Sequence, residues 1–215
     1  MSTHDSLRLF FAIELNVELR QALTQLMDEL KQEPLGHRVK WEDPENLHVT
    51  LRFLEITNEI RLKLTTCAWD TNEFRSKADE LKSLYSIVVE CASGAIENIK
   101  PFSLQLHNVR FFPSPTAPRA IVADIISTSQ LFELAHVLEK AAVSLGLTPE
   151  TKPYLPHLTL GRIFHHHAPN LREELTLNTN AMLVDKIVLF NSEKTEYSQT
   201  YTPLERISLQ TKVNA

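Results

Sequence analysis

Cysteine and glycine are scarce in this chain of 215 residues. The two cysteines, Cys67 and Cys91, make no disulfide framework, and their spacing matches no zinc-binding pattern. The four glycines leave little room for a glycine-rich phosphate loop, and no Walker or dinucleotide-binding motif occurs. The sequence therefore indicates neither a disulfide scaffold nor a protein that binds a nucleotide through such a loop.

The chain also lacks a long apolar run and an excess of positive charge. No stretch is long enough to span a membrane, and Met1–Asp5 is polar, unlike a signal peptide, so we expect a cytoplasmic protein without a membrane partner. Lys and Arg total 22 and Asp and Glu total 27, which gives a net charge of −5. This charge argues against a protein that wraps long nucleic acid, but not against a pocket that grips one phosphate.

Strands and helices alternate along the first part of the chain. The apolar run Leu7–Leu15 predicts a buried strand, and Asn16 is a suitable N-cap for a helix that ends before Pro34. The apolar side of this predicted helix consists of Leu19, Leu23, Leu26 and Leu30. Further strands are predicted at His37–Trp41 and Leu47–Leu54.

The second half of the chain repeats this plan. Its predicted elements are, in order, strands at Phe102–Arg110 and Ala120–Ile126, a helix at Ser127–Gly146, and strands at Tyr154–Phe164, Val184–Asn191 and Ile207–Thr211. We therefore expect two related lobes, each made of a few strands packed on a helix. Between them, Thr57–Lys100 is rich in charged residues and predicts surface helices without any pattern that indicates chemistry.

The strand predicted at Leu47–Leu54 contains the triplet His48-Val49-Thr50. Side chains at positions i and i+2 of a strand point to the same face, so strict alternation puts His48, Thr50 and Arg52 together. The opposite, apolar core face is then formed by Leu47, Val49, Leu51 and Phe53. An imidazole, a hydroxyl and a guanidinium in a row make a good surface for holding a phosphate.

A second triplet, His157-Leu158-Thr159, occupies the matching part of the second half. Both triplets enclose an apolar residue and are followed by leucine. One such triplet would be compatible with a core histidine bonded to a neighbouring threonine. Two triplets in matched contexts favour a functional pair over two packing histidines.

The chemistry gives this pair of histidines a purpose. Opening a cyclic phosphate needs a base that takes a proton from water and an acid that protonates the departing sugar oxygen. Histidine suits both tasks because its unperturbed pKa lies near neutrality. The threonine hydroxyls can donate hydrogen bonds to the phosphate oxygens and stabilise the developing charge. Such a site needs no metal, and the sequence offers no carboxylate cluster to hold one.

These residues resemble the 2H phosphoesterases and, within them, the LigT-like RNA 2',3'-cyclic phosphodiesterases of bacteria and archaea, historically named 2'-5' RNA ligases. The resemblance is carried by LRLFFAIEL, VKWEDPENLHVTLRFL, VRFFPSPTAPR, YLPHLTLGRIF and VLFNSEKTEYSQTYTPLERISL. It covers most of the chain except roughly Glu55–Pro101. The paired triplets are strongly specific for the superfamily, and the flanking segments are moderately specific for the RNA branch.

The resemblance implies an α+β fold of two pseudo-symmetric lobes, with antiparallel sheets lining a central cleft and helices outside. Residues 1–215 would form one bilobal domain, with 57–100 as an extended helical segment. The implied reaction is hydrolysis of a 2',3'-cyclic phosphate at the 3' end of a short or tRNA-derived RNA, giving a 2'-phosphomonoester. No metal or other cofactor is implied, and we expect a monomer.

The resemblance also implies roles for individual residues. His48 would be the general acid facing the 3' oxygen, and His157 would be the base that activates water. Thr50 and Thr159 would bind the phosphate. The residues alone give two equivalent histidines and do not assign the acid and the base.

Arg162 matches a family position that contacts phosphate, although strict alternation from the second histidine puts it on the opposite face. A bulge at Gly161 would turn its side chain back. Arg52 has the right parity but weaker family support, so we predict that Arg162 binds the phosphate and keep Arg52 as the alternative. The chain also departs from the family where Glu55 replaces the usual glycine. The run His165-His166-His167 could suggest a metal site, but an exposed loop is the better interpretation.

Two other functions fit the same residues. The same hydrolysis could act on a small cyclic nucleotide or on the cyclic phosphate of ADP-ribose instead of an RNA end. Alternatively, the chain could be an RNA-end binding module, or a weak ligase of 2'-5' junctions. That second class would not need both histidines, so we rank it below the two enzymatic hypotheses.

Overall fold

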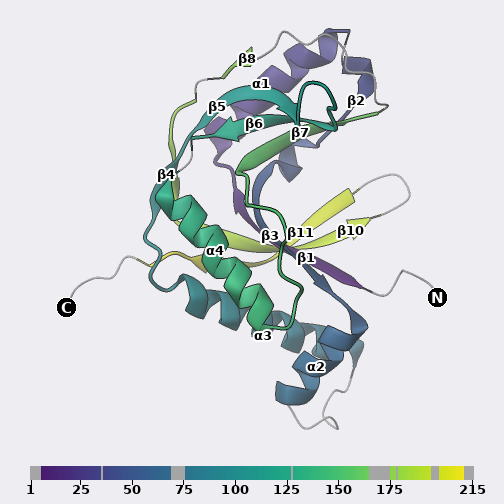
Figure 1. Ribbon diagram of the computed structural model, residues 1–215, viewed down its shortest axis with the longest axis vertical. Helices are drawn as coiled ribbons and strands as arrows, with labels where there is room; N and C mark the ends of the chain where they lie inside the picture. The colour runs from purple at the N-terminus through teal and green to yellow at the C-terminus, as the bar shows by residue number, and fades with distance from the viewer. Residues whose placement is uncertain are drawn as a thin grey trace.

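The structure, a computed structural model, describes residues 6–34, 36–68, 76–126, 128–164, 175–177, 179–194 and 199–210 (Figure 1). Its helices are α1 (Val17–Gln32), α2 (Asn58–Ala68), α3 (Lys77–Ile96) and α4 (Ser129–Ser144), with short 3-10 turns η1 (Gly36–Arg38) and η2 (Pro44–Asn46). Its strands are β1 (Leu7–Glu14), β2 (Val39–Trp41), β3 (His48–Ile56), β4 (Phe102–Leu104), β5 (Leu106–Phe112), β6 (Ala120–Ile125), β7 (His157–Ile163), β8 (Leu175–Thr176), β9 (Met182–Val184), β10 (Lys186–Lys194) and β11 (Gln199–Ser208).

The strands form a nine-stranded sheet in the order β11-β10-β1-β3-β7-β6-β5-β8, with β2 paired to β7 as well. A separate two-stranded sheet joins β4 and β9. The pairings are antiparallel, so the predicted α+β class with antiparallel sheet is confirmed. The two central strands, β3 and β7, share a single paired position, Val49 with Leu158. This narrow seam puts the two triplets next to each other.

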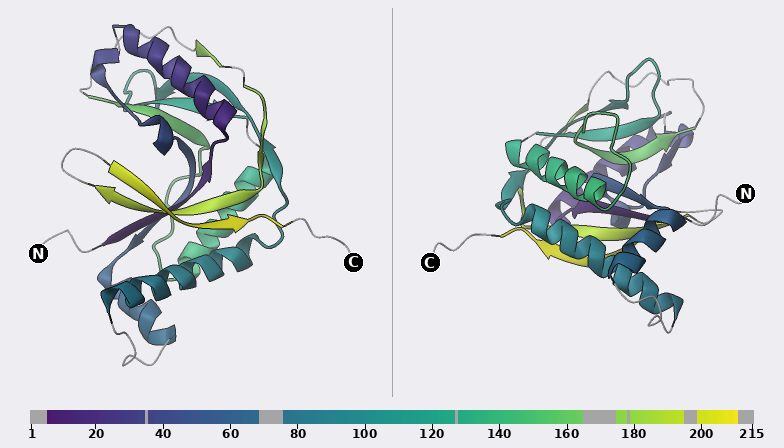
Figure 2. Two further views of the ribbon diagram at one scale, coloured as in Figure 1. Left: turned by 180° about the vertical axis from the view of Figure 1, so that it is seen from behind. Right: turned by 60° about the horizontal axis from the view of Figure 1, so that its bottom comes forward.

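Each side of the seam takes elements from both ends of the chain. Strand β2 pairs with β7, whereas β10 and β11, near the C-terminus, extend the sheet beyond β1. Figure 2 shows α1 on the side of β5, β6 and β7, while α3 and α4 lie on the side of β1, β3 and β10. The expectation that each lobe consists of its own half of the sequence was therefore wrong. The lobes exchange their helices and edge strands.

Capping residues explain where helices α1 and α4 begin. The Asn16 side chain accepts a hydrogen bond from the Leu19 backbone N–H at 2.9 Å, which confirms the predicted start of α1. Helix α4 is capped in the same way by Thr128. Gly146, with φ at +91°, follows the end of α4 in the left-handed conformation that favours glycine.

The segment between the predicted halves is helical where it is described, as α2 and α3. Its description as surface helices was incomplete. Helix α3 buries an apolar stripe in the main core and packs against α4; the stripe consists of Leu84, Val88, Ala92 and Ile96. The C-terminal strand also differs from the prediction, because β11 begins at Gln199, well before the predicted Ile207. Its polar, largely exposed residues hid it from the apolar pattern.

Strand β1 is buried on both faces, which explains its continuous apolar sequence. One face contributes Leu9, Phe11 and Ile13 to the main core. The other contributes Phe10 and Ala12 to a second cluster with Val188 and Phe190, against which Tyr201 packs. The first histidine, His48, packs against this second cluster through the Phe10 ring. Within the described ranges, no helix is long and apolar enough to cross a membrane.

Candidate active site

A bulge interrupts β3 directly after the first triplet. Thr50 lies opposite Ala12 and Arg52 lies opposite Phe11, so Leu51 is an extra residue without a partner. The bulge reverses the alternation that the sequence predicted. Arg52 is buried, with 7% of its surface exposed, whereas Phe53 is 54% exposed. The predicted grouping of Arg52 with the phosphate-holding face, and of Phe53 with the core, was therefore wrong.

Strand β7 carries the same irregularity after the second triplet. Thr159 lies opposite Val122 and Gly161 lies opposite Ile121, which leaves Leu160 as the extra residue. The bulge predicted near Gly161 is thus present, and Arg162 lines the same cavity as the triplets. The two halves therefore repeat a triplet, a bulged leucine and a cavity-lining residue five positions after the histidine, which is Phe53 in β3 and Arg162 in β7.

Gly161 is required by the close approach of β2. A Cβ atom added there would lie 2.4 Å from Val39 Cγ1 and 3.1 Å from the Lys40 carbonyl oxygen. The glycine lets β2 pair against the bulged part of β7, and β2 leads directly to Glu42. A packing requirement of the backbone thereby helps to place an acidic residue at the site.

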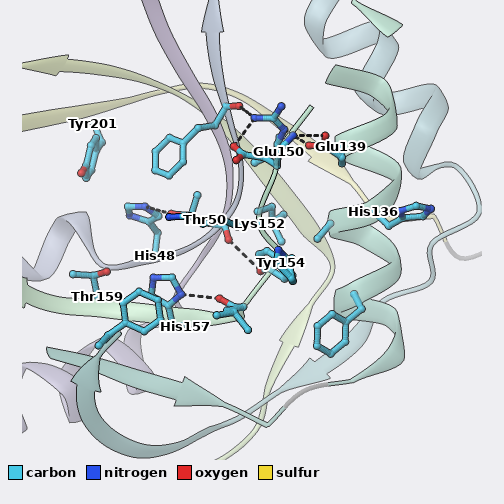
Figure 3. Close-up of a pocket in the computed structure, with 18 of the residues that line it drawn as sticks. His48, Thr50, His136, Glu139, Glu150, Lys152, Tyr154, His157, Thr159 and Tyr201 are labelled. Atoms are coloured by element: carbon cyan, nitrogen blue, oxygen red, sulfur yellow. Dashed lines mark hydrogen bonds and ion pairs between the residues drawn. The ribbon is translucent and has the colours of Figure 1, made fainter. Parts of the chain in front are cut away.

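The triplets open into one cavity of about 750 Å³ (Figure 3). All five predicted site residues line it: His48, Thr50, His157, Thr159 and Arg162. The other lining residues are Glu42, Asn46, Leu51, Arg52, Phe53, Phe112, Phe132, Ala135, His136, Glu139, Glu150, Lys152, Pro153, Tyr154, Leu155 and Tyr201. A cavity of this size accommodates a ligand larger than a phosphate ion.

His48 is held by a backbone carbonyl below it and by aromatic rings around it. Its Nδ1 lies 2.6 Å from the Asn46 carbonyl oxygen, which only accepts, so Nδ1 carries a proton. Its Nε2 lies 3.0 Å from the Thr50 hydroxyl. The rings of Phe10 and Tyr201 lie 4.9 and 5.2 Å away between centroids. These contacts fix the ring and leave Nε2 as the nitrogen that is not bonded to the backbone.

Burial lowers the pKa of His48 from its ordinary value of 6.5. The hydrogen bond to the Asn46 carbonyl opposes this shift, and the nearby charges of Arg162 and His157 add to it. An anionic phosphate bound between these groups would raise the pKa, because it compensates the positive charges. Protonation of His48 is therefore coupled to the binding of an anion.

His157 is anchored in the same manner. Its Nδ1 lies 2.7 Å from the Leu155 carbonyl oxygen, two residues earlier, as His48 Nδ1 does from Asn46. The Phe112 ring stacks on the imidazole at 4.8 Å between centroids and 14° between planes. Each histidine thus donates from Nδ1 to the backbone and keeps Nε2 for the cavity.

Arg162 lies at the mouth of the cavity, with 61% of its side chain exposed. Its Nε makes an ion pair of 3.2 Å with Glu42, the acidic residue that follows β2. Burial raises the pKa of the Tyr201 hydroxyl; Glu42 adds to this shift and Arg162 opposes it. Glu42 and Tyr201 were missed by the sequence-based predictions, since they come from different elements and belong to neither histidine triplet.

Arg52 is committed to a different set of partners. Its guanidinium pairs with Glu139 of α4 and Glu150, at 2.9 Å for the latter, and donates to the Thr148 carbonyl at 2.8 Å. Of the two candidate arginines, the structure therefore leaves Arg162 as the one that is accessible beside the histidines. Arg52 instead ties β3 to the segment that follows α4.

Comparison with known proteins agrees with this geometry. Residues 13–87 and 126–198 match the family model described as LigT like Phosphoesterase. The chain belongs to the LigT-like phosphoesterase family. Its two matched stretches include both histidine triplets.

Relatives of this LigT-like chain carry a common name. It is 26% identical to an RNA 2',3'-cyclic phosphodiesterase of Methanothermobacter thermautotrophicus over 206 residues, covering 92% of this chain and 96% of that protein. It is 23% identical to the protein of that name from Thermotoga maritima, covering 92% and 93%. The crystal structure of a Thermus thermophilus protein matches with a TM-score of 0.69 and 25% identity, over 95% of this chain and 99% of that one.

The described part of the LigT-like cavity contains no evident metal-binding group. Among the residues that the structure describes, no three His, Cys, Asp or Glu side chains are grouped so that they could hold a metal ion. The run His165-His166-His167 lies outside the described residues. The five predicted site residues contribute two imidazoles, two threonine hydroxyls and one guanidinium to the cavity, and these groups suit the binding of an anion and proton transfer.

Proposed function

We propose that this LigT-like phosphoesterase hydrolyses 2',3'-cyclic phosphate ends of RNA to 2'-phosphomonoesters. The observation that carries the proposal is the matched pair of histidines, each anchored through Nδ1 to the carbonyl two residues earlier and each lining the same cavity. The names of the relatives support the substrate.

The proposed reaction uses one histidine as acid and the other as base. His157 Nε2 takes a proton from water, and the water oxygen forms a bond to phosphorus. The bond from phosphorus to the 3' oxygen breaks, and that oxygen takes the proton from His48 Nε2. The products are a 2'-phosphomonoester and a free 3' hydroxyl. This assignment of acid and base follows the family resemblance, because the two rings are anchored alike.

The remaining three residues bind the phosphate in this proposal. Thr50 and Thr159 donate hydrogen bonds to the non-bridging oxygens, and Arg162 supplies the positive charge that the two neutral hydroxyls lack. In the free protein Arg162 is paired with Glu42. An incoming phosphate would compete with Glu42 for Arg162, whose side chain is exposed.

The test is incubation in EDTA with a short RNA that ends in a 2',3'-cyclic phosphate, with chromatographic identification of the product isomer. We expect a 2'-phosphate and a loss of at least about a hundredfold in kcat for His48→Ala and His157→Ala. His37→Ala, at an exposed histidine in η1, is the matched control. Substantial turnover by either cavity variant would refute the proposal. We also propose that the chain acts as a single monomeric unit, which light scattering after gel filtration would check.

A further inference from the structure

The cavity extends well beyond the residues that would hold one phosphate. The part of the cavity that runs from the triplets to helix α4, here called the α4 arm, is lined by Phe132 and His136 of α4 and by Lys152, Tyr154 and Leu155 of the segment before β7. Figure 3 shows Lys152 and Tyr154 between the histidine pair and the helix that carries His136. The arm is continuous with the catalytic end, so one ligand can occupy both.

The α4 arm exposes large apolar surfaces. Phe132 is 44% exposed and Leu155 is 56% exposed, although both are large hydrophobic side chains. The Phe132 ring meets the Tyr154 ring edge to face, with centroids 6.2 Å apart. Aromatic and aliphatic surfaces displayed side by side in a cleft are suited to the flat face of a nucleobase.

Lys152 provides the arm with a positive charge. It makes no hydrogen bond or ion pair with any residue in the described part of the chain. The two carboxylates at this end, Glu139 and Glu150, are instead engaged by Arg52. A single uncommitted ammonium beside apolar surfaces matches the phosphodiester and base of one further nucleotide.

Resting on the proposed function, we propose that the α4 arm binds the penultimate nucleotide of the RNA. Lys152 contacts the phosphodiester that precedes the terminal nucleotide, and Phe132 and Leu155 contact the penultimate base. The arm therefore selects an oligonucleotide end over a mononucleotide that carries the same cyclic phosphate. The cavity supplies this preference without long tracts of basic residues, consistent with the net charge of −5.

The first experiment compares kcat/KM for adenosine 2',3'-cyclic monophosphate with that for the adenosine dinucleotide that ends in the same cyclic phosphate. We expect the dinucleotide to be preferred by at least about tenfold, since one stacked base contributes about that factor. Lys152→Gln should lower this ratio by about fivefold and make it less sensitive to salt. Lys140→Gln, at an exposed lysine of α4 that does not line the cavity, is the control and should leave the ratio unchanged.

A dinucleotide with a neutral methylphosphonate between the two nucleosides isolates the predicted contact between Lys152 and the phosphodiester. In the unmodified protein this substitution should lower kcat/KM several-fold, and in Lys152→Gln it should have no further effect, because the pair is already broken. Phe132→Ala should lower the dinucleotide preference by about tenfold, with Val143→Ala, exposed on α4 away from the cavity, as the control.

The outcomes separate the two proposals. Turnover of the mononucleotide with no preference for the dinucleotide would overturn the proposed role of the α4 arm and leave the proposed function intact. An equal loss of the dinucleotide preference in Lys152→Gln and in its control Lys140→Gln would also overturn the proposed role of the α4 arm. Absence of turnover on both substrates would refute the proposed function, and the inference that rests on it.

Discussion

The hydroxyl of Tyr154 donates a hydrogen bond of 3.1 Å to the backbone carbonyl of Thr50. This bond spans the seam between the two central strands, which otherwise share one paired position, Val49 with Leu158. Tyr154 also lies three residues before His157. The bond therefore connects the backbone of the first triplet to the segment that precedes the second triplet. It helps to set the distance between the two histidines.

Removal of this hydroxyl should affect the chemical step more than substrate binding. We expect Tyr154→Phe to lower kcat about tenfold with little change in KM, because small misplacements of catalytic groups are costly. The free energy of unfolding should fall by about 1 kcal/mol. Tyr85→Phe, which removes a hydroxyl from α3, is the control. A loss of stability with an unchanged kcat would show that the bond is only structural.

The guanidinium of Arg52 should contribute strongly to stability. Arg52→Met leaves the Glu139 carboxylate and the Thr148 carbonyl without their partner, and we expect a loss of about 3 kcal/mol in urea unfolding. Glu150 should contribute little to this loss, because its side chain is 54% exposed and solvent screens its charge.

Two further variants test this account of Arg52. Arg52→Lys should recover only part of the stability, since one ammonium cannot satisfy three partners in a fixed geometry. Arg20→Met breaks the ion pair with the exposed carboxylate of Glu45 and should cost less than about 1 kcal/mol. Equal losses in Arg52→Met and Arg20→Met would contradict the buried network.

The same arginine shows where prediction from sequence succeeded and where it failed. The triplets, the helix after Asn16 and the antiparallel α+β class were predictable, because periodicity and capping are local properties. The bulge at Gly161 was also predictable, since glycine marks a strand irregularity. The equivalent bulge at Leu51 carries no such mark, and it moved Arg52 and Phe53 to unexpected faces.

Other parts of the site depend on contacts between distant segments. Glu42 reaches the cavity because β2 pairs with β7, and Tyr201 reaches it because β11 follows β10 along the first lobe. Neither residue lies in a histidine triplet or an apolar repeat. Such positions are set by sheet topology, and the exchange of elements between the lobes is not encoded in any local pattern.

Glycine at position 161 should be irreplaceable while β2 stays in place. Gly161→Ala brings a Cβ to within 2.4 Å of Val39 Cγ1, and we expect a loss of about 2 kcal/mol in thermal or urea unfolding. Val39→Ala in the same chain removes that atom and should restore part of the stability, since the Lys40 carbonyl oxygen still lies at 3.1 Å. Additive losses in the double variant would contradict this explanation.

A second glycine provides the control for this prediction. Nothing lies within 4 Å of a Cβ added to Gly94 in α3, so Gly94→Ala should stabilise the helix by about 0.5–1 kcal/mol. The opposite signs expected at the two positions separate a steric clash from the general effect of replacing glycine. Activity should fall only in Gly161→Ala, because a displaced β2 also shifts its partner Arg162 in β7, which lines the cavity.

The lowered pKa of His48 links protonation to folding. The unfolded chain binds a proton at this residue near its ordinary pKa of 6.5, and the folded chain binds it only at a lower pH. Between these two values the unfolded state holds more protons, so the stability contributed by neutral His48 rises with pH. The contribution is fully present above 6.5 and is lost as the pH falls through the folded pKa.

His48→Asn should therefore remove part of the acid sensitivity of folding. We expect the unmodified protein to lose stability between pH 6.5 and 5 by more than the variant does, in urea titrations at each pH. Inorganic phosphate should reduce the difference, because an anion in the cavity raises the pKa of His48 towards its ordinary value. Identical pH dependence in the two proteins would show that His48 titrates alike in the folded and unfolded states, and the coupling between anion binding and the proton on His48 would then be lost.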